Sequence, residues 1–170
     1  GGKSINAALK MSEQGDCGRV IARDLSDYKV ALIDENIKRL NITNIQTQVY
    51  DALDCDESLI NKADIVIADL PCSGLGIIGR KPDIKYNASP EKLQSLVDLQ
   101  RDILKVVSRY VKSGGVLMYS TCTINRAENE DNADWICKES GFTKDGEYHQ
   151  LLPANNSGMD GFFVARLIKN

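Results

Sequence analysis

The chain has 170 residues, a length that suits one domain with a full hydrophobic core. Hydrophobic residues make up 42% of it and charged residues 26%, which is ordinary for a globular protein. The apolar runs are too short for a transmembrane helix, and no secretory signal opens the sequence. The formal net charge of −3 does not by itself indicate nucleic-acid binding, so an RNA partner would need a local basic patch or another domain.

The cysteines are odd in number, and none forms a Cys-x-x-Cys pair. This pattern argues against a disulfide framework and against a zinc site, so no metal is expected. Free thiols fit the reducing cytoplasm. Three of the five cysteines, Cys17, Cys55 and Cys137, are expected to be structural. The other two are Cys72 and Cys122.

Helical and strand patterns alternate along the chain. Helices are predicted over residues 4–13, 26–40, 89–111 and 127–139, with a short helical turn at 58–62. Strands are predicted over residues 19–23, within 42–50, over 63–68 and 116–120, from 141, and over 161–168. A long loop is predicted at 70–89 and a surface loop at 153–160.

This alternation predicts an α/β fold with a mainly parallel sheet and helices on both faces. The last strand needs no crossover helix and could be an antiparallel edge strand. A glycine-rich loop that opens a helix normally follows a strand. We therefore expect the first strand of the sheet to lie upstream of Gly1.

Several polar groups follow the predicted strands, at the sheet edge where ligands of such folds bind. Gly1-Gly2-Lys3 leads into a helix, where backbone N–H groups can meet an anion. Asp24, Asp51 and Asp69 end three strands, and an acid there can accept hydrogen bonds from ribose hydroxyls. Together these residues predict a site for a nucleoside-containing cofactor. The alternative is that each aspartate only forms a turn.

Two strand ends also present a thiol. Asp69-Leu70-Pro71-Cys72-Ser73-Gly74 follows one strand, and Ser120-Thr121-Cys122-Thr123 follows another. A thiolate can add to C6 of cytosine, which makes C5 nucleophilic enough to take a methyl group. An acid such as Asp69 can hold N3 protonated and favour the addition. The alternative is that both cysteines are small buried hydrophobic residues.

These two motifs, with Glu128-Asn129-Glu130 after the second, resemble the cysteine motifs of the RNA cytosine-5 methyltransferases. Gly1-Gly2-Lys3 resembles the end of their cofactor loop. Residues 81–86 and 160–166 are also similar to the family. The similarity is greatest to the bacterial Sun (RsmB-like) branch, which acts on small-subunit 16S ribosomal RNA.

The resemblance implies a Rossmann-like class I fold and S-adenosylmethionine as methyl donor. It implies that Cys122 is the nucleophile on C6, that Cys72 helps release the product, and that Asp69 contacts the cytosine. The residues alone do not tell which cysteine attacks. The cofactor would be held by Gly1, Gly2, Lys3, Asp24, Asp51 and Asp69. An RNA-binding domain is expected upstream of this catalytic domain.

Basic and aromatic residues gather in the loop that follows Cys72, and they are expected to meet RNA: Arg80, Lys81, Lys85 and Tyr86. Two other readings stay open at this point. One is a non-catalytic nucleotide-binding module, and the other is a thiol redox switch between Cys72 and Cys122. Cytosine methylation of transfer RNA or DNA is a narrower variant of the main hypothesis.

Overall fold

The computed structural model describes residues 1–153 and 158–170. Half of the surface loop predicted at 153–160, residues 154–157, therefore lies outside the described residues. The chain divides into two compact units, Gly1–Asp54 and Cys55–Asn170. Each unit has a sheet of its own, with two strands in the first and five in the second.

The first unit contains two helix–strand pairs. They are α1 (Gly2–Glu13), β1 (Val20–Asp24), α2 (Asp27–Arg39) and β2 (Ile45–Val49), and β1 pairs with β2 in parallel. Ser26 caps α2, since its Oγ accepts a hydrogen bond from the Lys29 N–H. The first helix begins earlier than predicted, so Gly2 and Lys3 belong to α1 instead of a loop before it.

The second unit contains the longer part of the chain, and its elements follow in order. They are η1 (Glu57–Leu59), β3 (Ala63–Asp69), η2 (Leu75–Ile77), α3 (Ile84–Asn87), α4 (Pro90–Val107), η3 (Ser108–Tyr110), β4 (Val111–Thr121), η4 (Arg126–Glu128), α5 (Glu130–Ser140), β5 (Phe142–Lys144), β6 (His149–Leu151) and β7 (Phe162–Lys169). The strand order is β3-β4-β7-β5, and β6 also pairs with β7.

Strand direction in this sheet is mixed. β3 and β4 run parallel, and β7 is antiparallel to β4, β5 and β6. The predicted antiparallel last strand is confirmed. It is not an edge strand, because β7 lies between β4 and β5.

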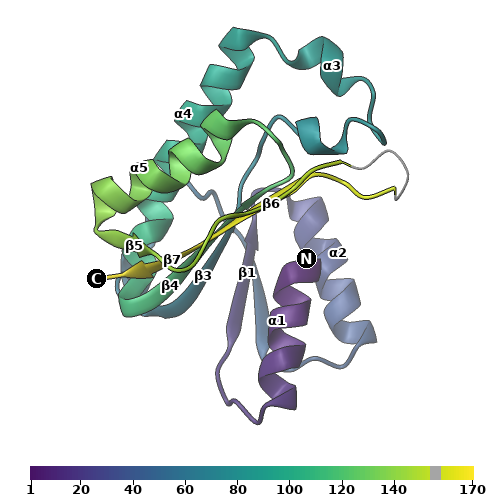
Figure 1. The fold of residues 1–170 in the computed structure, drawn as a ribbon. Helices are drawn as coiled ribbons and strands as arrows, with labels where there is room; N and C mark the ends of the chain where they lie inside the picture. Colours follow the sequence, from purple (N-terminus) through teal and green to yellow (C-terminus); the bar gives the residue numbers. More distant parts are fainter. Residues whose placement is uncertain (154–157) are drawn as a thin grey trace. The chain divides into compact units, whose positions relative to one another are not determined.

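One face of the second sheet forms the core of the unit. Leu117 and Tyr119 on β4 and Phe163 on β7 are fully buried, and the rings of Tyr119 and Phe163 meet edge to face with their centroids 6.0 Å apart. Helices α4 and α5 lie together on the same side of the sheet (Figure 1). On the opposite face of β3, Ile65 is 61% exposed and Ile67 44% exposed.

Some predicted boundaries are wrong, and pairing between distant segments explains them. The helix predicted to residue 111 ends at Val107, because Val111 is used in β4, where it pairs with Ala63. For the same reason β4 is longer than the predicted strand 116–120. The predicted loop 70–89 contains η2 and α3. Strand β6 was not predicted, because it is short and depends on β7 for its pairing.

No helix in the described part of the chain combines the length and the apolar character that crossing a membrane requires.

Candidate active site

The two cysteine motifs leave the same edge of the second sheet. β3 and β4 are parallel neighbours, and Asp69 pairs with Ser120 at their carboxyl ends. The loops that follow bring Cys72 Sγ to 3.2 Å from Cys122 Sγ. The Cys122 N–H also points at Cys72 Sγ, 3.3 Å away. Two thiols that are 50 residues apart in sequence therefore form one pair.

Asp69 lies at the start of this pair of loops. Its carboxylate is exposed at the end of β3 and accepts a hydrogen bond of 3.0 Å from the Ser120 hydroxyl. Ser120 begins the motif that contains Cys122. The acid is therefore tied to the second cysteine loop and remains accessible to a ligand.

The thiol of Cys72 holds its proton tightly. Its hydrogen bond with the Cys122 thiol, together with burial, raises the pKa of Cys72 far above the ordinary value for cysteine. At neutral pH, Cys72 is therefore a neutral thiol. Because only a thiolate is a good nucleophile, Cys72 is poorly suited to attack and better suited to a step that needs a protonated partner.

Replacing Cys122 by alanine should increase the reactivity of Cys72. The largest cause of the raised pKa is lost, so a larger fraction of Cys72 is thiolate at pH 8.5, although burial still disfavours it. We expect alkylation of Cys72 by iodoacetamide to become at least about fivefold faster. Mass spectrometry of the Cys72 peptide measures the rate. Cys137→Ala, which removes a thiol from α5, is the control and should leave that rate unchanged.

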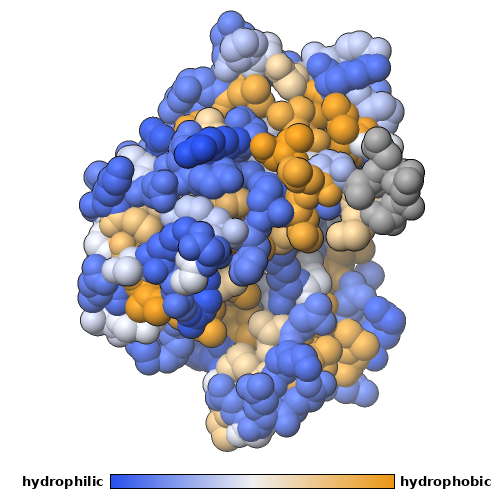
Figure 2. Space-filling model, viewed as in Figure 1, coloured by the Kyte–Doolittle hydropathy of each residue, from blue (hydrophilic) through white to orange (hydrophobic). Residues whose placement is uncertain are grey.

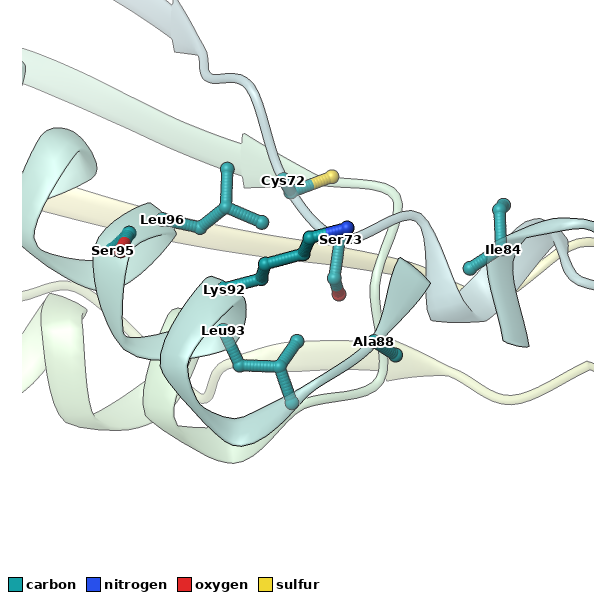
Figure 3. A pocket seen from close by; sticks show the side chains of 8 residues that line it. All are labelled: Cys72, Ser73, Ile84, Ala88, Lys92, Leu93, Ser95 and Leu96. Atoms are coloured by element: carbon teal, nitrogen blue, oxygen red, sulfur yellow. The ribbon is translucent and has the colours of Figure 1, made fainter. Parts of the chain in front are cut away.

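A cavity of about 400 Å³ adjoins Cys72 and is open to solvent. Apolar side chains form much of its wall, and Figure 3 shows the long side chain of Lys92 reaching from α4 toward Ser73. A cation beside apolar walls suits a flat group that carries a nearby negative charge. Sequence reasoning missed Lys92, because it lies in α4 and outside both motifs. The lining residues are Cys72, Ser73, Ile84, Ala88, Lys92, Leu93, Ser95 and Leu96.

The surface near the second cysteine loop is apolar. Figure 2 shows hydrophobic residues gathered around η2 and the neighbouring ends of β6 and β7. The Gly161 N–H, just before β7, donates to the Gly76 carbonyl in η2 at 2.7 Å, so these segments touch. Large apolar side chains exposed in these parts of the chain are Ile124, Leu151, Leu152 and Met159.

A buried polar network lies beneath the cysteine pair. It contains Glu128, Gln100 and Asn129, each with no exposed surface. Motif reading did not single out Gln100, but its spacing offers a signal. Gln100 follows Val97 by three residues and precedes Leu104 by four, which places a polar side chain on the apolar face of α4.

The predicted cofactor residues lie partly in the first unit. Gly1, Gly2 and Asp24 line one cavity there of about 450 Å³. One oxygen of Asp24 accepts a hydrogen bond of 2.9 Å from the Ser26 N–H, and the other lies 3.7 Å from Lys29 Nζ. The carboxylate keeps acceptor capacity for ribose hydroxyls, so these residues fit a nucleoside.

The three other predicted cofactor residues are not among those that line this cavity. Asp51 forms a turn, since its Oδ1 accepts a hydrogen bond of 2.9 Å from the Leu53 N–H. Lys3 belongs to α1. Asp69 lies in the second unit, and the structure describes each unit separately.

The predicted RNA-contacting residues are all exposed, between η2 and α4. Lys85 Nζ lies 4.8 Å from the centre of the Tyr86 ring, and Tyr86 is 78% exposed. Arg80 pairs with Asp160 at 3.2 Å, so part of its charge is compensated. Lys81 is exposed in the same segment.

The fold of the chain is that of the class I S-adenosylmethionine-dependent methyltransferases, as the solved structures similar to it show, and its two adjacent thiols lie at the ends of parallel strands. The solved structure PH0851 superposes with a TM-score of 0.82 and 30% identity, over 89% of this chain and 37% of that one. NSun6 from Pyrococcus horikoshii superposes with a TM-score of 0.74 and 26% identity, over 89% of this chain and 41% of that one.

The family follows from the sequence match. Residues 1–168 match the family model described as 16S rRNA methyltransferase RsmB/F, and the chain belongs to this family of S-adenosylmethionine-dependent RNA methyltransferases. A probable ribosomal RNA small subunit methyltransferase B from Bacillus subtilis is 36% identical over 99% of this chain. The chain spans 41% of the length of that relative.

Proposed function

We propose that the chain catalyses methylation at C5 of a cytosine in 16S ribosomal RNA, through a covalent adduct between Cys122 and C6 of the base. The observation that carries this proposal is the contact of 3.2 Å between the Sγ atoms of Cys72 and Cys122. A buried structural cysteine needs no second thiol, whereas an adduct needs one group to form it and another to end it.

The reaction begins with the thiolate of Cys122. Its sulfur forms a bond with C6, and the electron pair moves toward C5, while a protonated N3 held by Asp69 lowers the cost of the addition. S-adenosylmethionine supplies the methyl group that C5 takes. A water molecule then takes the C5 proton, and the C5–H electron pair forms the C5=C6 double bond. The C6–S bond breaks in the same step, and its electron pair returns to the sulfur of Cys122.

Cys72 acts in the last step, in which the C6–S bond breaks and the product is released. Its raised pKa keeps it a neutral thiol beside the sulfur that must leave, so it can hydrogen-bond to the departing thiolate. The same contact explains why the two cysteines are not interchangeable. Two thiols in contact cannot both be thiolates, so one attacks while the other keeps its proton, and the resemblance of the Ser120–Thr123 motif to the family assigns the attack to Cys122.

Gly1, Gly2 and Asp24 are the residues proposed to bind the methyl donor. Lys81, Lys85 and Tyr86 are proposed to meet RNA next to the target base, with Arg80 weakened in this role by Asp160. The target cytosine must be unstacked or single-stranded to reach the thiols. The adjacent thiols also favour catalysis over a nucleotide-binding module, in which they would have no task.

Bisulfite sequencing of RNA tests the proposed substrate. We expect that cells lacking the gene lose bisulfite protection at one or more cytosines of small-subunit ribosomal RNA, because C5-methylated cytosine resists deamination. Complementation with the intact gene should restore protection. Loss of protection only in transfer RNA would replace the substrate, and unchanged protection in all RNA would overturn the proposal.

A further inference from the structure

Glu128 is a buried carboxylate whose role the reaction above does not explain. Its side chain has no exposed surface. Four hydrogen bonds converge on its two oxygens, from the Ser73 N–H at 2.8 Å, the Ser73 hydroxyl at 2.6 Å, Gln100 Nε2 at 3.0 Å and Asn125 Nδ2 at 2.9 Å. Four donors fill the acceptor capacity of an ionised carboxylate. Such a group is costly to bury unless all these bonds form.

Two of the four donors belong to the loop that carries Cys72. Ser73 directly follows Cys72, and Glu128 binds both its backbone and its side chain. Gln100 Nε2 donates to Glu128 and also to the carbonyl of Pro71, at 2.9 Å, directly before Cys72. Both chain neighbours of Cys72 are therefore fixed by one buried cluster.

The same cluster reaches the second cysteine loop. The Ser73 hydroxyl lies 2.7 Å from the hydroxyl of Thr123, which directly follows Cys122. Asn125, the fourth donor, lies two residues further on, and its backbone N–H donates to Thr123 Oγ1 at 3.2 Å. Glu128 thus binds Ser73, next to Cys72, directly and reaches Thr123, next to Cys122, through Ser73 and Asn125.

We propose that Glu128 is a positioning residue for the two-thiol reaction, and that it acts through Ser73 to hold Cys72 against Cys122. This inference rests on the proposed function for its kinetic part, but the position of Cys72 can be measured without RNA. A displacement of about 1 Å at a reacting group can cost about a hundredfold in rate. Loss of the Glu128 contacts should therefore affect the step that uses Cys72.

Glu128→Gln is the test variant in the full-length protein. The amide replaces one acceptor oxygen by an NH₂ group, so one of the surrounding N–H donors faces another donor. Ser73 N–H and Gln100 Nε2 share one oxygen, and Asn125 Nδ2 uses the other. The fewest hydrogen bonds are lost when the new NH₂ group faces Asn125, where it meets the Nδ2 donor.

Asn125→Asp offers a matched rescue of this variant. Asn125 Oδ1 accepts a hydrogen bond of 3.2 Å from the Ala127 N–H, and an aspartate keeps this bond. Its second oxygen would accept from the NH₂ group of Gln at position 128. Asn125→Asp alone places two carboxylates side by side and should itself lower activity. The double variant should therefore be more active than either single one.

We expect Glu128→Gln to lower kcat for RNA methylation about tenfold to a hundredfold, with KM for RNA within about threefold of wild type. Covalent protein–RNA adduct should accumulate on a denaturing gel, because release is the slowed step, and we expect the same of Cys72→Ala. The double variant should recover kcat to within about threefold of wild type. Glu139→Gln, which removes an exposed carboxylate from α5, is the control for the charge change and should behave as wild type.

A measurement without RNA separates this inference from the proposed function. Iodoacetamide should alkylate Cys72 faster in Glu128→Gln than in wild type, because a displaced Cys72 loses its contact with Cys122. Faster alkylation in a protein whose wild type methylates no RNA would reject the proposed function and retain the positioning role. Methylation that depends on Cys122, with wild-type kcat and alkylation in Glu128→Gln, would reject the positioning role alone.

A purely structural role would give a different pattern. In that case Glu128→Gln would lower the melting temperature and kcat without accumulating adduct, and adding Asn125→Asp would not restore kcat. This pattern would overturn the inference. If Glu128→Gln does not fold, Ser73→Ala is the second variant, since it removes only the hydroxyl contacts. We expect Ser73→Ala to lower kcat about threefold to tenfold and to accumulate the covalent RNA adduct. Wild-type kcat without adduct would overturn the inference.

Discussion

Cys122→Ala in the full-length protein should lower the rate of methyl transfer to 16S ribosomal RNA by at least about a thousandfold. Without the sulfur no bond to C6 forms, and C5 of cytosine stays a poor nucleophile. Cys72 is more reactive in this variant, but burial still disfavours its thiolate and its sulfur stays on the other loop, so it does not take over the attack on C6. Transfer of a radiolabelled methyl group from S-adenosylmethionine measures the effect, with cofactor binding checked by calorimetry.

Two other cysteine variants make this result specific. Cys72→Ala should still form the bond to C6 and should retain a covalent adduct with RNA, visible as a shifted band in a denaturing gel. Cys137→Ala, in α5, should methylate RNA at the wild-type rate. Activity above about a tenth of wild type in Cys122→Ala would refute the assigned nucleophile.

Gly76→Ala should destabilise the protein by about 3 kcal/mol, a large value for a single added methyl group. A Cβ at Gly76 would lie 2.6 Å from the Gly161 carbonyl oxygen and 2.8 Å from that of Cys122. Both obstacles are backbone atoms, so a rotamer change cannot relieve the contact. The Gly76 N–H also donates to the Cys122 carbonyl at 3.1 Å, so the strain should displace the nucleophile.

Urea unfolding of Gly76→Ala beside Gly79→Ala measures this effect. A Cβ at Gly79 meets no atom within 4 Å, so that variant controls for the change in chain entropy between glycine and alanine. We expect Gly79→Ala to unfold within about 0.5 kcal/mol of wild type and to retain activity. Equal free energies of unfolding for the two variants would show that the backbone contact at Gly76 is relieved at little cost.

The sequence predicted best what depends on short apolar runs and the residues that end them. The strand before Asp69 and the strand before Cys122 were both placed correctly, and parallel pairing then required the two thiols to share an edge. Pairing that depends on distant partners was harder to predict. The central position of β7 and the short β6 follow from contacts across the sheet, which local patterns do not contain.

The burial of Glu128 beneath the site could not be predicted from local sequence patterns. Glu128 lies among acidic residues near a helix start, where an acid is ordinarily exposed. Its burial depends on hydrogen bonds that Glu128, in η4, accepts from Ser73 and Gln100, which are distant in the sequence. The assignment of Asp51 and Lys3 to the cofactor, the upstream strand and the RNA-binding domain all stay predictions.

The contact between Cys72 and Cys122 has a practical consequence for any assay of this protein. A disulfide bond is about 2.05 Å long, so the sulfur atoms at 3.2 Å need to move only about 1 Å to form one. Hydrogen peroxide can remove two electrons and two protons from the pair and is itself reduced to water. Stored without a reductant, the protein would lose nucleophile and partner together, and an active preparation would be mistaken for an inert one.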